Sequence, residues 1–264
     1  MTPLPALFIS HGSPMIAVAD GPARRFLTGL GRQLGRPAAV LVLSAHWETD
    51  VPTLGTAERP GTIHDFGGFP RDLYALRYPA PGAPAVAGTA AALLRDAGLD
   101  VRLDPQRGLD HGAWIPLLLM YAQADVPVLQ LSVQPGLGPR HHFALGTALR
   151  RLRDEGVLVL GSGSLTHNLG ELFRGPARNE ASGGVPDWVT NFADWIADRI
   201  AVGDTRALLE YRTLAPAAER NHPTDEHLLP LFAALGAGTP GVPGRRLHSS
   251  VDAGILAMDA YAFD

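Results

Sequence analysis

Three short apolar segments, each followed by a turn that carries a histidine, constrain the fold of this chain more than any other feature. The segments and their histidines are 6–10 (ALFIS) before His11, 39–44 (AVLVLS) before His46, and 157–160 (VLVL) before His167. Runs of this length and composition are typical of buried strands. In an open α/β sheet, ligands bind beyond the carboxyl ends of the strands, so the three imidazoles should converge there. Because imidazole binds zinc, iron and copper, the pattern predicts a metal-centred site.

The rest of the chain alternates between strand-like and helix-like segments. This order favours one α/β domain over residues 1–264, with a central, largely parallel or mixed sheet flanked by helices. Segment 51–83 is rich in proline and glycine and is expected to form a long ordered loop, a feature that is usually functional. The other expected elements are helices at 22–34, 84–97, 116–122, 139–155 and after 185, a helix capped by Thr224, strands at 101–103 and 126–133, and an edge strand within 254–263.

Composition excludes several classes of protein. The chain has no lysine and a net charge of -4, so the basic footprint of a nucleic-acid-binding protein is missing. The absence of cysteine excludes disulfides, thiolate metal sites and cysteine nucleophiles, so any metal should have nitrogen and oxygen ligands. No apolar run approaches the roughly 20 residues of a membrane span. We therefore expect a soluble, cytoplasmic protein that acts as a monomer or small homo-oligomer.

The remaining histidines differ in what their surroundings suggest. His111 lies between an aspartate and a glycine, which suits an acid/base group. His222 and His227 lie on either side of a predicted helix start, and Pro223 should bend the chain so that both can face the site. His64 belongs to the long loop, from which it could touch a substrate. Purely structural roles are expected for His141, His142 and His248.

Common hydrolase motifs do not fit. The Gly/Ser-rich turn at 161–164 lacks the G-x-S-x-G spacing of a nucleophile elbow, and the H-E-x-x-H helix of zinc proteases is absent. Seven motifs in order instead resemble the 4,5-DOPA-extradiol-dioxygenase-like proteins of the class III extradiol aromatic ring-opening dioxygenase superfamily. They are FISHGSP (8–14), SAHWE (44–48), IHDFGGFP (63–70), LDHGAW (109–114), GSGSLTHN (161–168), NHPTDEH (221–227) and MDAY (258–261).

The resemblance implies a non-haem enzyme that uses Fe(II) and O₂ to open a catechol ring beside its two hydroxyls. In relatives, Zn(II) often occupies the same site, so zinc is expected in the protein as purified. The resemblance assigns metal ligation to His11, His46 and His222. It assigns acid/base catalysis to His167, which reaches the metal in some relatives, and a catalytic role near the metal to His111. The residues expected to contact the substrate are His64, Phe66, Trp114 and His227.

One feature of the resemblance separates this subgroup from its superfamily. The wider superfamily uses two histidines and a carboxylate, whereas here His222 is expected to replace the carboxylate. A neutral third ligand leaves the full charge on the metal, which should favour a bound catecholate and tolerance of zinc. Two alternatives stay open at this point. One is a zinc hydrolase in which metal-bound water is the nucleophile; the other is a non-catalytic member that binds a partner.

Overall fold

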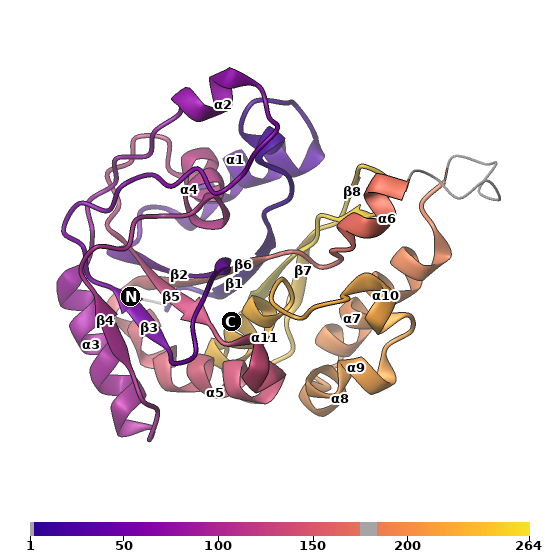
Figure 1. Ribbon diagram of the computed structural model, residues 1–264. Coiled ribbons are helices and arrows are strands. Elements are labelled where there is room, and N and C mark those ends of the chain that lie inside the picture. The colour runs from indigo at the N-terminus through magenta and orange to yellow at the C-terminus, as the bar shows by residue number, and fades with distance from the viewer. Residues whose placement is uncertain (1–2, 175–183) are drawn as a thin grey trace.

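A mixed sheet of eight strands forms the centre of the computed structural model, which describes residues 3–174 and 184–264 (Figure 1). Its strand order is β4-β3-β5-β2-β6-β1-β10-β7. The strands are β1 (Ala6–Ser10), β2 (Ala39–Glu48), β3 (Thr53–Gly55), β4 (Arg102–Asp104), β5 (Val128–Val133), β6 (Val157–Gly163), β7 (Arg245–His248) and β10 (Ala260–Phe263). A second, two-stranded sheet pairs β8 (Val251–Asp252) with β9 (Leu256–Ala257).

The middle of the large sheet is parallel. Strands β5, β2, β6 and β1 are consecutive neighbours in this orientation, and Leu41 of β2 lies opposite Leu129 of β5 and Val159 of β6. Their carboxyl ends therefore share one edge. Segment 6–10 forms β1, segment 39–44 lies within β2, and segment 157–160 begins β6. Each of the three segments that precede a histidine turn is therefore a strand or part of one. The expected α/β fold with a central, largely parallel or mixed sheet flanked by helices is confirmed.

Helices cover both faces of this sheet, as Figure 1 shows with α1 and α4 on one side and α3, α5 and α11 on the other. Alternating residues of β2 divide between the two resulting cores. Leu41 packs in the core that includes Phe232 of α11, and Val42 packs in the core that includes Leu117 of α4. Burial on both faces explains why these strands read as continuous apolar runs. The five helices are α1 (Pro22–Leu34), α3 (Pro84–Asp96), α4 (His111–Met120), α5 (Gly138–Leu149) and α11 (Leu229–Ala237).

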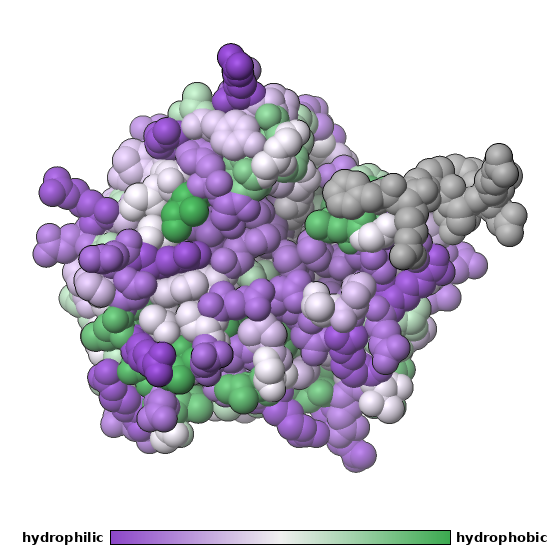
Figure 2. Space-filling view, viewed as in Figure 1, coloured by the Kyte–Doolittle hydropathy of each residue, from purple (hydrophilic) through white to green (hydrophobic). Residues whose placement is uncertain are grey.

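Further helices surround this framework, and several of them form a group beside the sheet at the right of Figure 1. The further elements are α2 (Arg71–Ala75), α6 (Leu169–Arg174), α7 (Asp187–Ala201), α8 (Thr205–Leu209), α9 (Tyr211–Leu214), α10 (Ala218–Asn221) and the 3₁₀ turns Pro14–Ala17, Pro135–Leu137 and Arg150–Glu155. Within the described residues, none of the helices is long and apolar enough to cross a membrane. The face shown in Figure 2 is mostly hydrophilic and is interrupted by small hydrophobic areas.

Two element starts differ from the sequence prediction. Helix α4 begins at His111 rather than 116, because the Asp110 side chain accepts a hydrogen bond from the Ala113 amide at 3.2 Å and caps the helix. Pro116 consequently lies inside the helix. Helix α11 begins at Leu229, and the Thr224 hydroxyl donates to Glu226 Oε1 instead of capping a helix. Both starts shape the site described below.

Two further differences concern the sheet and the long loop. The strand expected at the sheet edge, β10, lies between β1 and β7, and β7 was not anticipated because its sequence RRLH lacks an apolar run. The loop predicted at 51–83 contains β3 and α2. The sequence also predicts a polar, glycine-containing loop at 172–184, of which residues 175–183 lie outside the described part of the chain.

Candidate metal centre

Three histidines from distant segments converge at the carboxyl edge of the parallel strands. His11 follows β1, His46 lies near the end of β2, and His227 lies in the turn before α11. The Nε2 atom of His46 is 3.0 Å from that of His11 and 3.3 Å from that of His227. With metal–imidazole bonds of about 2.0–2.1 Å, two nitrogens on one ion lie roughly 3.0 Å apart in octahedral and 3.4 Å apart in tetrahedral geometry. The spacing therefore suits a shared metal ion.

Close backbone packing holds two of these histidines in place. The His11 amide donates to the Gly163 carbonyl at 2.9 Å, which ties the turn after β1 to the end of β6. On the other side of Gly163, the His227 carbonyl accepts from the Ser164 amide at 2.8 Å. A Cβ atom on residue 163 would lie 2.0 Å from the His227 carbonyl oxygen, so only glycine permits this approach.

The outer ring nitrogen of each histidine faces an oxygen atom. An imidazole that donates from Nδ1 carries its lone pair on Nε2, so such partners direct lone pairs to the common centre. Three lone pairs aimed at one point repel one another unless a cation lies between them, so the donor set fits a divalent metal ion. Hydrogen bonds of this kind join His11 Nδ1 to Ser162 Oγ at 3.0 Å and His227 Nδ1 to Glu226 Oε1 at 2.9 Å, whereas His46 Nδ1 lies 3.7 Å from Asp65 Oδ2, beyond hydrogen-bond distance.

Burial keeps this cluster neutral. His11 and His227 are almost completely buried, and desolvation, followed by the charges of neighbouring histidines, lowers the pKa of both well below 6.5. Desolvation, with a further contribution from His111, lowers the pKa of His46 to about 3. Neutral imidazoles are the form that binds a metal.

His111 lies directly beside the cluster. Its ring centroid is 3.9 Å from that of His46 and 5.5 Å from that of His11. Asp65 holds it from two sides, because Oδ1 accepts from the His111 amide at 2.9 Å and Oδ2 lies 3.0 Å from His111 Nδ1. Burial opposes ionisation of Asp65, but the hydrogen bonds and charge of His111 outweigh it and lower the pKa of Asp65 to about 2. Asp65 is thus an anion that orients His111.

The start of α4 packs against the cluster because residue 112 is glycine. A Cβ atom there would lie 2.5 Å from Ser44 Oγ and 3.0 Å from His46 Cδ2. Asp110, which caps the helix, is completely buried and accepts from the Ser44 hydroxyl at 2.6 Å and from Gln130 Nε2 at 2.7 Å. Asp110 therefore fixes the helix start and is not free to act as a base.

His167 lies on the other side of the cluster. Its ring stacks on that of His227, with centroids 3.4 Å apart and an angle of 11° between the planes. It is half-buried, and desolvation lowers its pKa below 6.5. One of its nitrogens groups with donor atoms of His227 and Glu226 within 4.8 Å. His167 is therefore a neutral base at the border of the cluster.

The structure does not bring His222 into the cluster, which corrects the expected ligand set. Among the described residues, no group of three or more donor atoms within 4.8 Å includes His222. Its ring is completely buried, and Nε2 donates to the Leu165 carbonyl at 2.8 Å. The chain bends at Pro223, and His227 rather than His222 lies beside His46. His227 was expected to contact the substrate. Spacing alone could not decide which of the two histidines enters.

The three aromatic residues expected to contact substrate form one group, but they differ in access. Phe66 is half-buried, and its ring lies 5.6 Å from His111 and 6.4 Å from Trp114. Trp114 is completely buried and donates from Nε1 to the Ile63 carbonyl at 2.9 Å, so it supports the wall from behind. His64 is half-buried, and its Nε2 lies 3.1 Å from the Leu76 carbonyl oxygen.

The sequence did not indicate which residues place an oxygen atom near the Nδ1 atoms of the clustered histidines. Glu226 lies next to His227 in its motif, and that adjacency was an available signal, whereas Asp65 lies next to His64 in sequence but contacts His46 and His111. Ser162 had no comparable signal, because its contact with His11 joins residues 151 positions apart. The histidines expected to be structural stay outside the cluster. His142 is completely buried, and its Nε2 accepts from the Gln134 amide.

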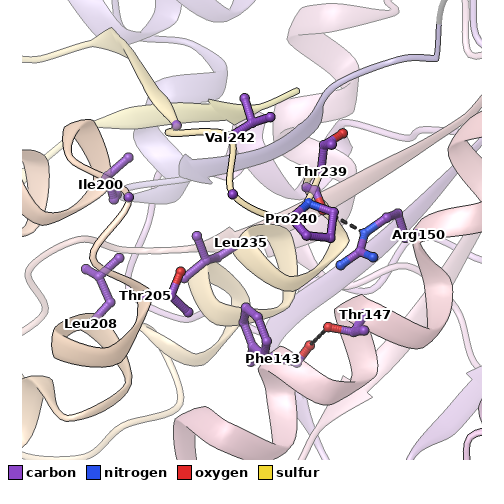
Figure 3. A pocket seen from close by; sticks show the side chains of 14 residues that line it. Phe143, Thr147, Arg150, Ile200, Thr205, Leu208, Leu235, Thr239, Pro240 and Val242 are labelled. Carbon is purple, nitrogen blue, oxygen red and sulfur yellow. Dashed lines mark hydrogen bonds between the residues drawn. The ribbon is translucent and has the colours of Figure 1, made fainter.

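A separate cavity of about 310 Å³ lies among α5, α7, α8 and α11 (Figure 3). Its lining is largely apolar and contains none of the clustered histidines. Its one charged side chain, Arg150, already donates to the carbonyls of Gly238 and Gly236. The residues that line this cavity therefore add no free titratable or metal-binding side chain to those of the histidine cluster.

Comparison with known proteins finds one matching family and several similar proteins. The catalytic LigB subunit of aromatic ring-opening dioxygenase is the family that matches residues 5–251. A protein of Beta vulgaris named 4,5-DOPA dioxygenase extradiol is 43% identical over 262 residues, which cover 97% of this chain and 95% of that protein. An Escherichia coli K12 protein of the same name is 39% identical, with 97% and 93% covered. The crystal structure of an uncharacterized Escherichia coli K12 protein has a TM-score of 0.81 at 34% identity, covering 99% of this chain and 100% of that one.

Proposed function

Because this chain belongs to the family of catalytic LigB subunits of aromatic ring-opening dioxygenases, we propose that it is a metal-dependent extradiol dioxygenase acting on DOPA-like catechols. The observation that carries the proposal is the convergence of three Nε2 atoms at the strand edge, with separations of 3.0 and 3.3 Å. The names of the similar proteins support the substrate class and the use of O₂.

The proposed metal ligands are His11, His46 and His227. His227 takes the place that the sequence reasoning gave to His222, for the geometric reasons above. Fe(II) held by these residues would supply the redox chemistry of O₂ and a positive charge that favours a deprotonated catechol. Zinc, which binds three histidines readily, is the metal expected in protein as purified.

His167 is the proposed acid/base residue. Its half-buried ring borders the cluster, and its lowered pKa leaves an imidazole nitrogen free to accept the catechol proton at neutral pH. His167 is thereby treated as a base and not as a fourth ligand. His111, oriented by Asp65, is proposed to hydrogen-bond substrate or oxygen.

Phe66 is proposed to contact the aromatic ring of the substrate. It lies edge-on to His111 at 5.6 Å and is backed by the buried Trp114. Aromatic pairs of this kind prefer edge-to-face or offset arrangements, which suits recognition of a flat ring. His64 extends the same wall. A cytoplasmic location, and a monomeric or small homo-oligomeric state, stay predictions.

The first test is metal content together with product formation. Protein purified without chelators or affinity-tag nickel should contain about one divalent ion per chain. After loading with Fe(II), it should convert DOPA to a yellow ring-opened product that is followed by absorbance. Protein with full metal content that hydrolyses an ester or amide, and leaves catechols intact, would support the zinc hydrolase, a function that the three-nitrogen site also suits.

A further inference from the structure

A buried chain of contacts leads from His11 into helix α4. His11 Nδ1 lies 3.0 Å from Ser162 Oγ, and the Ser162 hydroxyl donates to the carbonyl oxygen of Gly112. His11 and Ser162 are both nearly inaccessible to solvent, so water does not replace these contacts. The chain links β1, β6 and α4, three elements that surround the metal centre.

Pro116 explains why the Gly112 carbonyl is available to accept a hydrogen bond from Ser162. In an α-helix the amide of residue i donates to the carbonyl of residue i−4, so residue 116 would ordinarily satisfy Gly112. Proline has no amide hydrogen, and Pro116 lies within α4. The Gly112 carbonyl is therefore left without that donor and accepts the Ser162 hydroxyl instead.

The direction of the hydrogen bonds follows from this arrangement. A carbonyl only accepts, so the single Ser162 proton points to Gly112, and Ser162 Oγ offers only lone pairs to His11. His11 Nδ1 must then carry a proton. The lone pair of His11 is consequently on Nε2, the atom that lies 3.0 Å from His46 Nε2.

We propose that Ser162 is a positioning residue that locks His11 in the Nδ1–H tautomer, and that Pro116 enables it by leaving the Gly112 carbonyl open. The inference rests on the proposed metal centre and adds residues that do not touch the metal. A partner of this kind typically affects metal affinity by about 10- to 100-fold. Ser162 differs from Glu226, the carboxylate hydrogen-bonded to His227, because it is neutral and needs a second acceptor to fix its own proton.

The test measures metal affinity by competition with a chromophoric chelator, using Zn²⁺ and Co²⁺. Ser162→Ala should bind about 10- to 100-fold more weakly. Pro116→Ala restores an amide that competes for Gly112, so it should also bind several-fold more weakly. In the Ser162→Ala background, Pro116→Ala should add no further loss, because both changes act through one hydroxyl.

A direct readout of the tautomer accompanies the affinities. Long-range ¹H–¹⁵N correlation spectra of histidine-labelled, metal-free protein should show His11 protonated at Nδ1 in the wild type and a mixture of tautomers in Ser162→Ala. Ser132→Ala is the matched control. Ser132 is a completely buried serine of β5 whose hydroxyl contacts Thr49 and the Thr53 amide, so its loss should leave metal affinity unchanged.

The outcomes separate this inference from the proposed function. If Ser162→Ala binds metal as tightly as the wild type while His46→Ala loses it, the positioning role is wrong and the metal centre stands. If His46→Ala also retains full affinity, the metal centre itself is wrong. Additive losses in the double variant would overturn the role of Pro116. Thermal unfolding of each variant checks that the affinities refer to folded protein.

Discussion

At the residue scale, the neighbours of each imidazole decide which nitrogen it can offer. His227 has its Nδ1 beside Glu226, which leaves Nε2 free to face the centre. His222, five positions earlier, donates a hydrogen bond from Nε2 to the Leu165 carbonyl, and its ring packs against Phe192. Two histidines in one motif thus lie in different surroundings, one in the histidine cluster and one in the core.

This difference predicts opposite effects of two substitutions. His227→Ala should weaken metal binding by roughly several orders of magnitude, because affinity depends on the number and geometry of ligands. His222→Gln retains a side-chain N–H for the Leu165 carbonyl and should bind metal normally, with some loss of thermal stability. Metal content after dialysis distinguishes them. Loss of metal in His222→Gln, with retention in His227→Ala, would restore the ligand set expected from the sequence.

His167 supplies a second prediction at this scale. His167→Ala should keep the metal and lose roughly 10²–10⁴ in turnover, the range typical of a lost acid/base group. Because desolvation lowers the pKa of His167, its neutral base form predominates above pH 6.5. The decrease of the wild-type rate on the acid side of the pH profile, its acid limb, should therefore lie below pH 6.5. The variant should lack this limb. If metal content instead falls as far as in His46→Ala, His167 is a ligand.

At the element scale, the sequence predicted the helices and strands that are specified by local residue patterns. Strands 6–10 and 39–44 and the helix at 22–34 were predicted because apolar periodicity and a leading proline are local signals. The start of α4 and the place of β10 in the sheet were not, because they depend on a buried cap at Asp110 and on long-range pairing with β1. The histidine turns were predicted from strand ends, whereas their oxygen partners arise from tertiary contacts.

The packing of α4 against β2 gives an element-scale prediction. In Gly112→Ala, the added methyl would lie 2.5 Å from Ser44 Oγ and 3.0 Å from His46 Cδ2. We expect α4 to shift, with a stability loss of about 1–3 kcal/mol from overpacking and weaker metal binding. Gly88→Ala in α3 is the control, since its new methyl meets nothing within 4 Å and should be neutral or stabilising. Equal effects in both variants would contradict this account.

At the scale of the whole molecule, burial of neutral histidines links folding to pH. Desolvation is the main cause that lowers the pKa of His142 and His222 to about 4, and His11 and His227 are also lowered. The unfolded chain binds protons near 6.5, so each such histidine stabilises the unfolded state increasingly as pH falls below that value.

The metal-free protein should therefore lose stability between pH 6.5 and about 4, by up to roughly 1.4 kcal/mol per pH unit for each buried histidine. Urea unfolding at several pH values measures this slope. Bound metal should make the fall steeper, because protons compete with the metal for the same nitrogens. A stability that is flat from pH 7 to 5 without metal would show that these histidines are not buried in neutral form.

The most direct test of the central claim is O₂ uptake in an oxygen electrode, with a catechol such as DOPA and protein loaded with either Fe(II) or Zn(II). The account predicts one O₂ consumed per ring-opened product with Fe(II), and none with Zn(II), because zinc has no accessible redox change. His46→Ala loaded in the same way should consume none. If the Fe(II) protein takes up no O₂ with any catechol tried, and the zinc protein hydrolyses an ester or amide, the dioxygenase proposal is wrong.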